Sequence, residues 1–127
     1  MSGVELPHQH GEAQYITDIC CNLKSDKNFY EAADIFKQFG DANRLKIFYL
    51  LCHYEECVIN IAYIMNMSSP AVSHHLKFLK SSGLIESRRN GKEVFYKMAD
   101  TKESQLLHQT IEKLLQFICP IDTKNTK

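Results

Sequence analysis

The residues best suited to chemistry in this chain lie between Ser68 and Met98. This segment holds six Lys or Arg side chains and two Glu side chains, a local charge of +4, in a chain of 127 residues whose formal charges sum to zero. Positive charge concentrated in one segment of a neutral chain is typical of a protein that binds nucleic acid. The six cations are Lys77, Lys80, Arg88, Arg89, Lys92 and Lys97.

A helix that starts at Ser69-Pro70 is predicted to carry part of this charge. Serine is a favoured N-cap, and proline suits the first helical turn. At about 100° per residue, the apolar side chains of this helix share one face, and His75 is expected beside them in a structural role. The opposite face is polar and cationic, which suits a helix that reads the major groove of DNA. The inward face holds Val72, Leu76 and Leu79, and the outward face holds Pro70, Ser73, His74, Lys77, Lys80 and Ser81.

A basic hairpin is predicted directly after this helix. Residues 84–87 and 93–98 are runs typical of strands, and Asn90-Gly91 supplies the positive-φ pair that a tight primed turn needs. Three cations crowd the tip, where they can reach a phosphate backbone. The DNA-binding residues predicted on the helix and the hairpin are Ser69, Ser73, His74, Lys77, Arg88, Arg89, Asn90 and Lys92.

Four further helices, an arm and a tail are predicted around this surface. Residues 1–24 form a flexible arm with a weak helical tendency over 14–20, and a domain follows over 25–119, before a disordered tail over 120–127. Helices are expected over about 28–39, 41–53, 58–65 and 101–118. The helix over 58–65 and the groove-reading helix are separated by a short turn, which is the pattern of a helix-turn-helix.

The last helix has an apolar stripe that needs a partner. It could pack on the domain itself, but we favour antiparallel packing with its copy, together with the first helix, because a two-fold operator requires paired reading helices. The predicted dimerisation residues are Leu107, Ile111, Leu114 and Ile118.

Composition excludes several classes of protein. The longest apolar run, Ile47 to Cys52, is too short to cross a membrane, and the first residues contain no apolar signal segment. Five cysteines without regular spacing do not indicate a disulfide framework, so we expect a cytoplasmic protein with reduced thiols. No phosphate-binding glycine loop and no set of nucleophile, base and orienting acid is recognisable. An enzyme and an organic cofactor are therefore not expected.

The order of these elements resembles the ArsR/SmtB family of winged-helix repressors. The resemblance is carried by residues 39–47, 56–58, 69–76 and 91–96, each in the element expected for it. It implies a mainly α fold with a small β-hairpin, in the order α-α-α-α-β-β-α, as a homodimer through the first and last helices. It also implies a transcriptional repressor that binds a palindromic operator and is released by an inducer, typically a metal ion. The base-contacting residues would be Ser69, Ser73 and His74.

The resemblance also implies where a metal could bind. One family site uses an Asp and three other ligands on the last helix. Asp100 is present, but the other positions hold Lys102, Lys113 and Gln116, so this site is predicted to be lost. His108 and Glu112 stand one turn apart on that helix, and such a pair can bind a metal, but their place on its polar side favours a solvated pair.

A second family site joins thiolates at the start of the third helix to ligands of the arm. Cys57 matches one such position, whereas Ile59 stands where thiol-rich members have another Cys. Imidazole and thiolate ligands suit a zinc-like, cadmium-like or other thiophilic ion. Cys52 is expected to be a core thiol. The candidate ligands are Cys57, Cys20, Cys21, His8 and His10, and we expect only one of the adjacent Cys20 and Cys21 to bind, since both could hardly reach one ion without strain.

Two other functions stay open at this point. A thiol-redox or persulfide sensor of the same fold would link two cysteines on oxidation. A protein-interaction module would use the winged helix without DNA. The cysteines available to a redox switch are Cys20, Cys21, Cys57 and Cys119.

Overall fold

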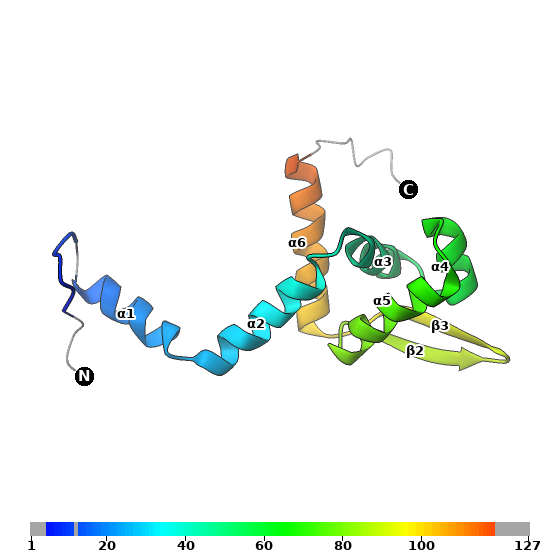
Figure 1. Cartoon of the computed structure of the whole chain (residues 1–127), viewed down its shortest axis with the longest axis horizontal. Coiled ribbons are helices and arrows are strands. Elements are labelled where there is room, and N and C mark those ends of the chain that lie inside the picture. The colour runs from blue at the N-terminus through cyan, green and yellow to red at the C-terminus, as the bar shows by residue number, and fades with distance from the viewer. Residues whose placement is uncertain (1–4, 12, 119–127) are drawn as a thin grey trace. The chain divides into compact units, whose positions relative to one another are not determined.

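The structure is a computed structural model that describes residues 5–11 and 13–118 of the chain (Figure 1). It divides into two compact units, residues 1–37 and 38–127, which are treated separately below. None of the helices described is both long enough and apolar enough to cross a membrane. The tail over 120–127 lies outside the described residues.

The first unit contains helix α1 (Ala13–Leu23) and most of helix α2 (Asp26–Gln38). The sequence led us to expect an irregular arm with only a weak helical tendency here, so the full length of α1 is a correction. Ile16, Ile19 and Leu23 recur at helical spacing, and the span of α1 contains neither glycine nor proline. A turn in which Ser25 N donates to Asn22 O, at 3.0 Å, separates α1 from α2.

Helix α3 (Ala42–His53) lies at the centre of the second unit. Asp41 is its N-cap and accepts a hydrogen bond from Arg44 N at 3.0 Å. As its nearly continuous apolar sequence predicts, α3 is largely buried. Its most buried side chains join those of the following helices and strands in one core. That core contains Ile47, Phe48, Leu51, Ile61, Ala62, Val72, Leu76, Leu79, Leu84, Ile85 and Ile111.

Helices α4 (Val58–Met65) and α5 (Ser69–Ser81) form the predicted helix-turn-helix (Figure 1). Asn66 turns the chain between them in the left-handed conformation, with φ 54°, and Met67 N donates to Ala62 O at 3.0 Å. The N-cap of α5 is Ser68, whose hydroxyl accepts from Ala71 N at 3.2 Å. The expectation that Ser69 caps this helix is therefore wrong by one residue.

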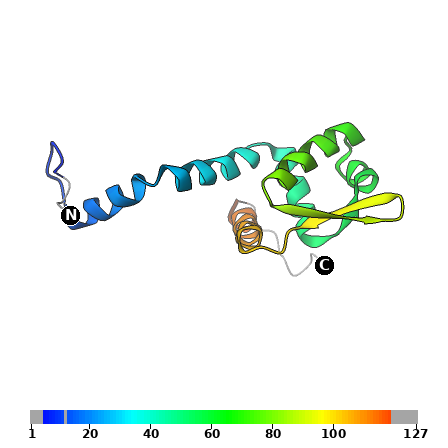
Figure 2. The same cartoon turned by 90° about the horizontal axis from the view of Figure 1, so that it is seen from below.

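Three antiparallel strands follow the order β1-β3-β2. Strands β2 (Ile85–Asn90) and β3 (Glu93–Met98) form the hairpin, which projects beside α5 (Figure 2). The two-residue strand β1 (Glu56–Cys57), which the sequence did not predict, pairs Cys57 with Phe95.

The turn of the hairpin differs from the expected one. Asn90 is paired with Glu93 as the last residue of β2, so the central residues are Gly91 and Lys92. Gly91 has φ 68°, whereas neither Asn90 nor Lys92 has a positive φ. Glycine at the first central position is the pattern of a type II′ turn, which needs only one positive φ. The Asn90-Gly91 pair therefore does not form the two centre positions.

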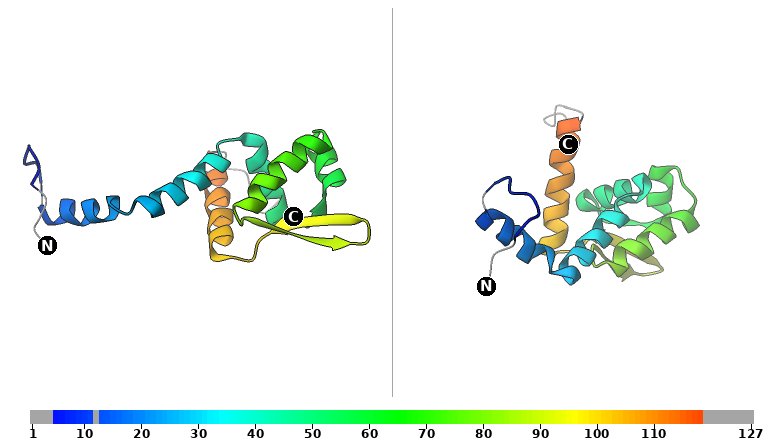
Figure 3. Two further views of the ribbon diagram at one scale, coloured as in Figure 1. Left: turned by 60° about the horizontal axis from the view of Figure 1, so that its bottom comes forward. Right: turned by 60° about the vertical axis from the view of Figure 1, so that its left-hand side comes forward.

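Helix α6 (Lys102–Ile118) closes the second unit, at the end away from the hairpin tip (Figure 3). Ser104 anchors its first turn, because its buried hydroxyl donates to Leu84 O at 3.1 Å. Of the four predicted dimerisation residues, Ile111 lies in the core of the chain and Leu107 packs against it. Helical spacing identifies an apolar face but not its partner, so the prediction is corrected for Ile111, whereas for the half-buried Leu107 it stays a prediction. The apolar side chains of α6 that stay exposed are Leu106, Leu114, Leu115, Phe117 and Ile118.

Candidate functional site

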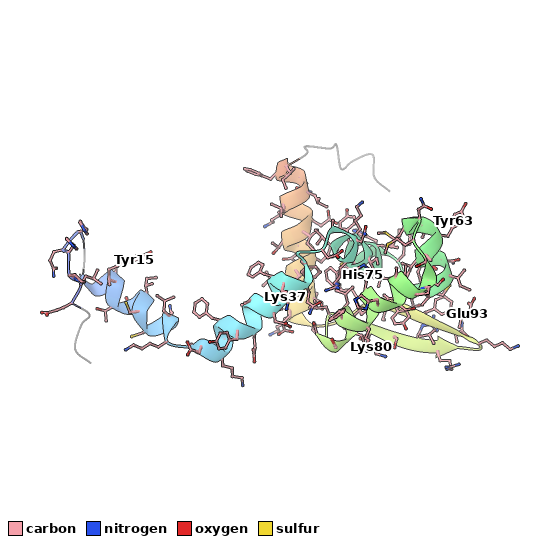
Figure 4. The ribbon with its side chains drawn as sticks, in the orientation of Figure 1. Tyr15, Lys37, Tyr63, His75, Lys80 and Glu93 are labelled. Atoms are coloured by element: carbon pink, nitrogen blue, oxygen red, sulfur yellow. The ribbon has the colours of Figure 1, made fainter. Side chains whose placement is uncertain are left out.

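The outward face of α5 is polar and cationic, as expected. Val72, Leu76 and Leu79 are 0–1 % exposed, and they hold the helix against α3 and α4. Figure 4 shows Lys80 on the outer side of α5 and His75 on the side toward α3. The predicted base- and phosphate-contacting residues of this helix are all exposed: Ser69, Ser73, His74 and Lys77.

His75 has the structural role that the sequence predicted. Arg44 Nε donates to its Nδ1 at 3.2 Å, and Arg44 Nη1 donates to the buried Gln38 Oε1 at 2.8 Å. Because a guanidinium has no acceptor, Nδ1 must accept and Nε2 carries the proton of the neutral ring. Burial lowers the pKa of His75, while Asp41, whose Oδ1 lies 4.0 Å from Nε2, partly opposes that shift. The charges of Arg44 and His74 lower it further.

Arg44 and Phe78 support the neighbouring histidine, His74. The guanidinium carbon of Arg44 lies 4.4 Å from the centroid of the Phe78 ring, a cation–π contact. The edge contact between His74 and Phe78 has a centroid distance of 4.8 Å. The exposed imidazole therefore rests on a ring that is itself fixed from α3.

Arg88 in the hairpin is engaged within the chain. Its Nε and Nη2 donate to the two carboxylate oxygens of Glu55, at 2.8 and 2.7 Å, in a bidentate pair. Hydrogen bonding to Arg88 lowers the pKa of Glu55, and the same contact raises the pKa of Arg88. The guanidinium also stands over Phe95, 5.3 Å from its centroid. Arg88 was predicted to contact DNA, but much of its charge is already compensated by Glu55.

Three other cations are available on this side of the second unit. Lys77, Arg89 and Lys92 are exposed, and none of them forms an ion pair or hydrogen bond with another described residue. Lys80 instead donates to Ser87 Oγ at 2.7 Å and links α5 to β2. The exposed face of α5 and the hairpin tip together make one basic surface, here called the basic face. Its residues are Ser69, Ser73, His74, Lys77, Arg89, Asn90 and Lys92.

The residues predicted for the thiolate site belong to different units and are described in each unit separately. Cys57 is 6 % exposed and stands at the N-cap of α4, where its side chain makes no capping hydrogen bond. In the first unit, the rings of His8 and His10 stack with centroids 5.9 Å apart, and Cys20 and Cys21 are consecutive residues of α1. This ligand set stays a prediction. The predicted redox partner Cys119 lies outside the described residues.

Sequence reasoning missed one histidine of a second cluster. His108 and Glu112 were expected to be a solvated pair, yet both are half-buried, and His53 joins them from the end of α3. Glu112 Oε1 lies 3.0 Å from His53 Nε2 and 3.1 Å from His108 Nε2. His53 and Glu112 are 59 positions apart, so no local spacing could have connected them.

Glu112 contributes to raised pKa values of two groups close to this cluster. Burial, followed by the charge of Glu112, raises the pKa of Cys52 to about 12. Burial and then Glu112 also raise the pKa of Tyr49. Cys52 is a neutral thiol packed against the core, in agreement with the sequence prediction.

Known proteins resemble this chain in sequence and in fold. A family model described as the arsR family of bacterial regulatory proteins matches residues 41–87. A cadmium resistance transcriptional regulatory protein CadC homolog of Staphylococcus aureus is 37% identical over 84 residues, which are 65% of this chain and 69% of that protein. A transcriptional repressor SmtB homolog of Synechocystis is 34% identical over 66% of this chain, and the match spans 64% of its own length.

Among solved structures, one similar chain is the homodimeric winged helix-turn-helix DNA-binding domain of a possible ArsR-family regulator from Mycobacterium bovis. The two share 28% identity with a TM-score of 0.64, over 72% of this chain and 83% of that chain. These findings confirm the winged helix-turn-helix fold and the family that the sequence resembles. They also agree with the absence of an enzyme motif, because the matching family consists of regulators. The chain belongs to the ArsR family of bacterial regulatory proteins, which are DNA-binding transcriptional regulators.

Proposed function

We propose that this protein is a homodimeric repressor that binds a two-fold operator through the basic face and leaves it when a thiophilic or borderline metal ion binds. Such a regulator works where the operator is, in the cytoplasm. The metal ligands would be drawn from Cys57, one of the adjacent Cys20 and Cys21, His8 and His10.

The observation that carries the operator proposal is the pairing of a polar helix face with a basic hairpin tip. A helix that is buried on one side and short, polar and cationic on the other can enter a major groove and place side chains on base edges. Lys77, Arg89 and Lys92 supply charge that no described residue neutralises, which favours contact with phosphates. His74 and Ser73 supply groups that can discriminate between bases.

The dimer proposal is supported by apolar side chains left without cover within the chain. Leu114, Phe117 and Ile118 of α6 are 52, 88 and 69 % exposed, and Phe29 and Phe36 of α2 are 50 and 76 % exposed. Side chains of this kind gather where a second copy packs. The Mycobacterium bovis domain of similar fold is homodimeric.

The metal proposal is supported by the donor set. Cys57 is a free thiol without a capping bond, and the first unit offers two further thiols and two imidazoles. Sulfur with imidazole nitrogen suits zinc and softer ions such as cadmium. A relative from Staphylococcus aureus is named for cadmium resistance.

Selection from a random duplex pool tests this proposal. The full chain should enrich a palindrome whose half-sites are about one helical turn, roughly 34 Å, apart. Fluorescence anisotropy with that duplex should show release on addition of Cd²⁺ or Zn²⁺ under reducing conditions, and Cys57→Ser should abolish that release while keeping operator binding.

The outcomes separate the alternatives. No enrichment of any sequence, with binding to a protein instead, would support an interaction module. Release by an oxidant in the presence of a chelator, without response to metal, would support a thiol switch.

A further inference from the structure

A cluster of two histidines and one glutamate joins the end of α3 to α6. The ligand atoms of His53, His108 and Glu112 all lie within 4.8 Å of one another. Ligands bound about 2.0–2.1 Å from a tetrahedral Zn²⁺ lie about 3.4 Å apart. The observed separations of 3.0 and 3.1 Å from Glu112 Oε1 to the two Nε2 atoms therefore need to widen by only a few tenths of an ångström.

We propose that His53, His108 and Glu112 form a binding site for a borderline divalent cation such as Zn²⁺, separate from the thiolate site. The donor set is imidazole and carboxylate without sulfur, which suits zinc better than the softest ions. Three protein ligands leave a fourth position for water.

The arrangement is fixed before any ion arrives. Ile111, next to Glu112, is in the core with residues of α3, which holds the two helices together. The edge of the Tyr49 ring packs on His53 with centroids 4.8 Å apart, and the rings of His53 and His108 are 4.9 Å apart at 89°. Because the ligands are positioned by packing, little conformational entropy is lost on binding.

The cluster is also open enough for an ion to enter. The side chains of His53, His108 and Glu112 are 39, 24 and 29 % exposed. An ion pair at that exposure contributes at most about 1 kcal/mol to the free energy of unfolding. These contacts therefore add little to the stability of the fold. To coordinate the metal, Nε2 of each histidine must first give up any proton that it carries. That proton moves to Nδ1 or leaves to solvent, and the freed Nε2 lone pair binds the ion.

A consequence for regulation rests on the proposed function. The exposed apolar side chains Leu114, Phe117 and Ile118 are on α6, so an ion at this site would tie the dimer-forming helix to α3. Occupancy of the site is then expected to change operator affinity. Operator affinity and metal binding at the cluster are separate measurements. Failure of the regulatory effect can therefore be distinguished from failure of metal binding.

Cobalt provides the test, because Co²⁺ substitutes for Zn²⁺ and its absorption reports the ligands. The metal-free, reduced full chain is titrated with Co²⁺ in wild type, in Cys57→Ser, and in Cys57→Ser combined with Glu112→Gln or His108→Gln. We expect visible d–d absorption typical of four-coordinate cobalt that Cys57→Ser retains, with no sulfur-to-cobalt charge-transfer band in that variant. Addition of Zn²⁺ should remove the absorption.

When added to Cys57→Ser, which removes the thiolate site, Glu112→Gln and His108→Gln should each weaken Co²⁺ binding at least about 10-fold, since even outer partners of metal ligands have effects of that size. Glu103→Gln makes the same chemical change at an exposed carboxylate of α6 and should bind like wild type. Circular dichroism of the metal-free variants checks that they fold. Chemical shifts of His53 and His108 on addition of Zn²⁺ give a readout that does not need a variant.

The proposal is overturned if adding Glu112→Gln to Cys57→Ser leaves cobalt binding unchanged, or if Cys57→Ser alone abolishes all absorption. It is also overturned if wild type gives no d–d band and Zn²⁺ leaves both histidine rings unshifted.

Discussion

Two histidine clusters in the second unit differ in the charge of the group that joins their members. Arg44 joins His75 to Gln38, whereas Glu112 joins His53 to His108. The guanidinium always donates and stays positive, so it holds one neutral tautomer and repels a cation. The carboxylate accepts and attracts a cation. The partner of a histidine, rather than the histidine itself, decides whether the ring is structural or free to act as a ligand.

The same contrast separates neighbouring residues of the hairpin and of α5. Arg88 is held by Glu55, whereas Arg89, the next residue, has no partner among the described residues. His75 points inward to Arg44, whereas His74 is exposed. Neighbours in sequence therefore divide into groups satisfied within the chain and groups available to a ligand.

The largest expected effect comes from removing the joining group of the buried cluster. Arg44→Met leaves two buried acceptors, on His75 and Gln38, without a donor, and should lower the free energy of unfolding by about 3 kcal/mol. Glu112→Gln in the open cluster should lower it by less than about 1 kcal/mol without metal. Urea unfolding at neutral pH measures both.

Arg89→Met provides the control, because the same change at an exposed arginine should leave stability within about 0.5 kcal/mol. Equal losses for Arg44→Met and Glu112→Gln would break the distinction between the two clusters.

The two adjacent histidines of α5 should differ in what they control. His74→Ala should reduce discrimination between operator and random duplex by about 1–3 kcal/mol, because a base contact is lost. Its melting temperature should stay close to that of wild type, since His74 is exposed. Competition anisotropy measures the first quantity and thermal denaturation the second. If His74→Ala melted at a lower temperature but still discriminated normally between the duplexes, His74 would be a structural residue and not a base-contacting one.

The two hairpin arginines should differ in their salt dependence. Arg89→Gln should reduce the slope of log affinity against log salt by about 0.9, the effect of one lost phosphate contact. The double variant Glu55→Gln with Arg88→Gln keeps the net charge and should leave the slope unchanged, since that pair is already neutral. Anisotropy titrations over a range of salt concentrations test this. A reduced slope in the double variant would mean that Arg88 leaves Glu55 to bind phosphate.

The smallest effect concerns pH. Because the folded chain lowers the pKa of His75 below 6.5, the unfolded state binds more protons as pH falls through that value. The contribution of His75 is therefore fully present above pH 6.5 and decreases as pH falls toward the lowered pKa. Asp41, Arg44 and His74 are the charged and titratable groups around it.

Urea unfolding across that range, compared with His75→Asn, measures the contribution. The amide oxygen of asparagine can accept from Arg44 but does not titrate in that range. The free energy of unfolding of the variant should therefore depend less steeply on pH. Identical pH profiles would show that His75 does not contribute.

Much of the second unit follows from its sequence. Residues 58–65 were predicted as a helix and form one, because a mostly apolar stretch, interrupted by Asn60, ends at Asn66, which adopts the left-handed conformation easily. The face of α5 also follows from spacing. The cap of that helix was missed by one residue, since Ser68 and Ser69 are equally good caps and only backbone geometry distinguishes them.

The differences arise where distant parts of the chain meet. Strand β1 has two residues and exists only because β3 pairs with it. His53 belongs with His108 and Glu112 only after α3 and α6 have packed. The role of Leu107 and Ile111 depends on which surface covers them. Periodicity reports a face, and tertiary packing decides what that face touches.

Cys57 stands at a junction of the fold. It ends β1, where it is paired with Phe95 of the hairpin, and it also caps α4, the first helix of the helix-turn-helix. Its backbone is thus shared by the wing and by the support of the reading helix. A displacement of this residue is therefore expected to act on the wing and on the helix-turn-helix directly through the backbone, without intermediate side chains.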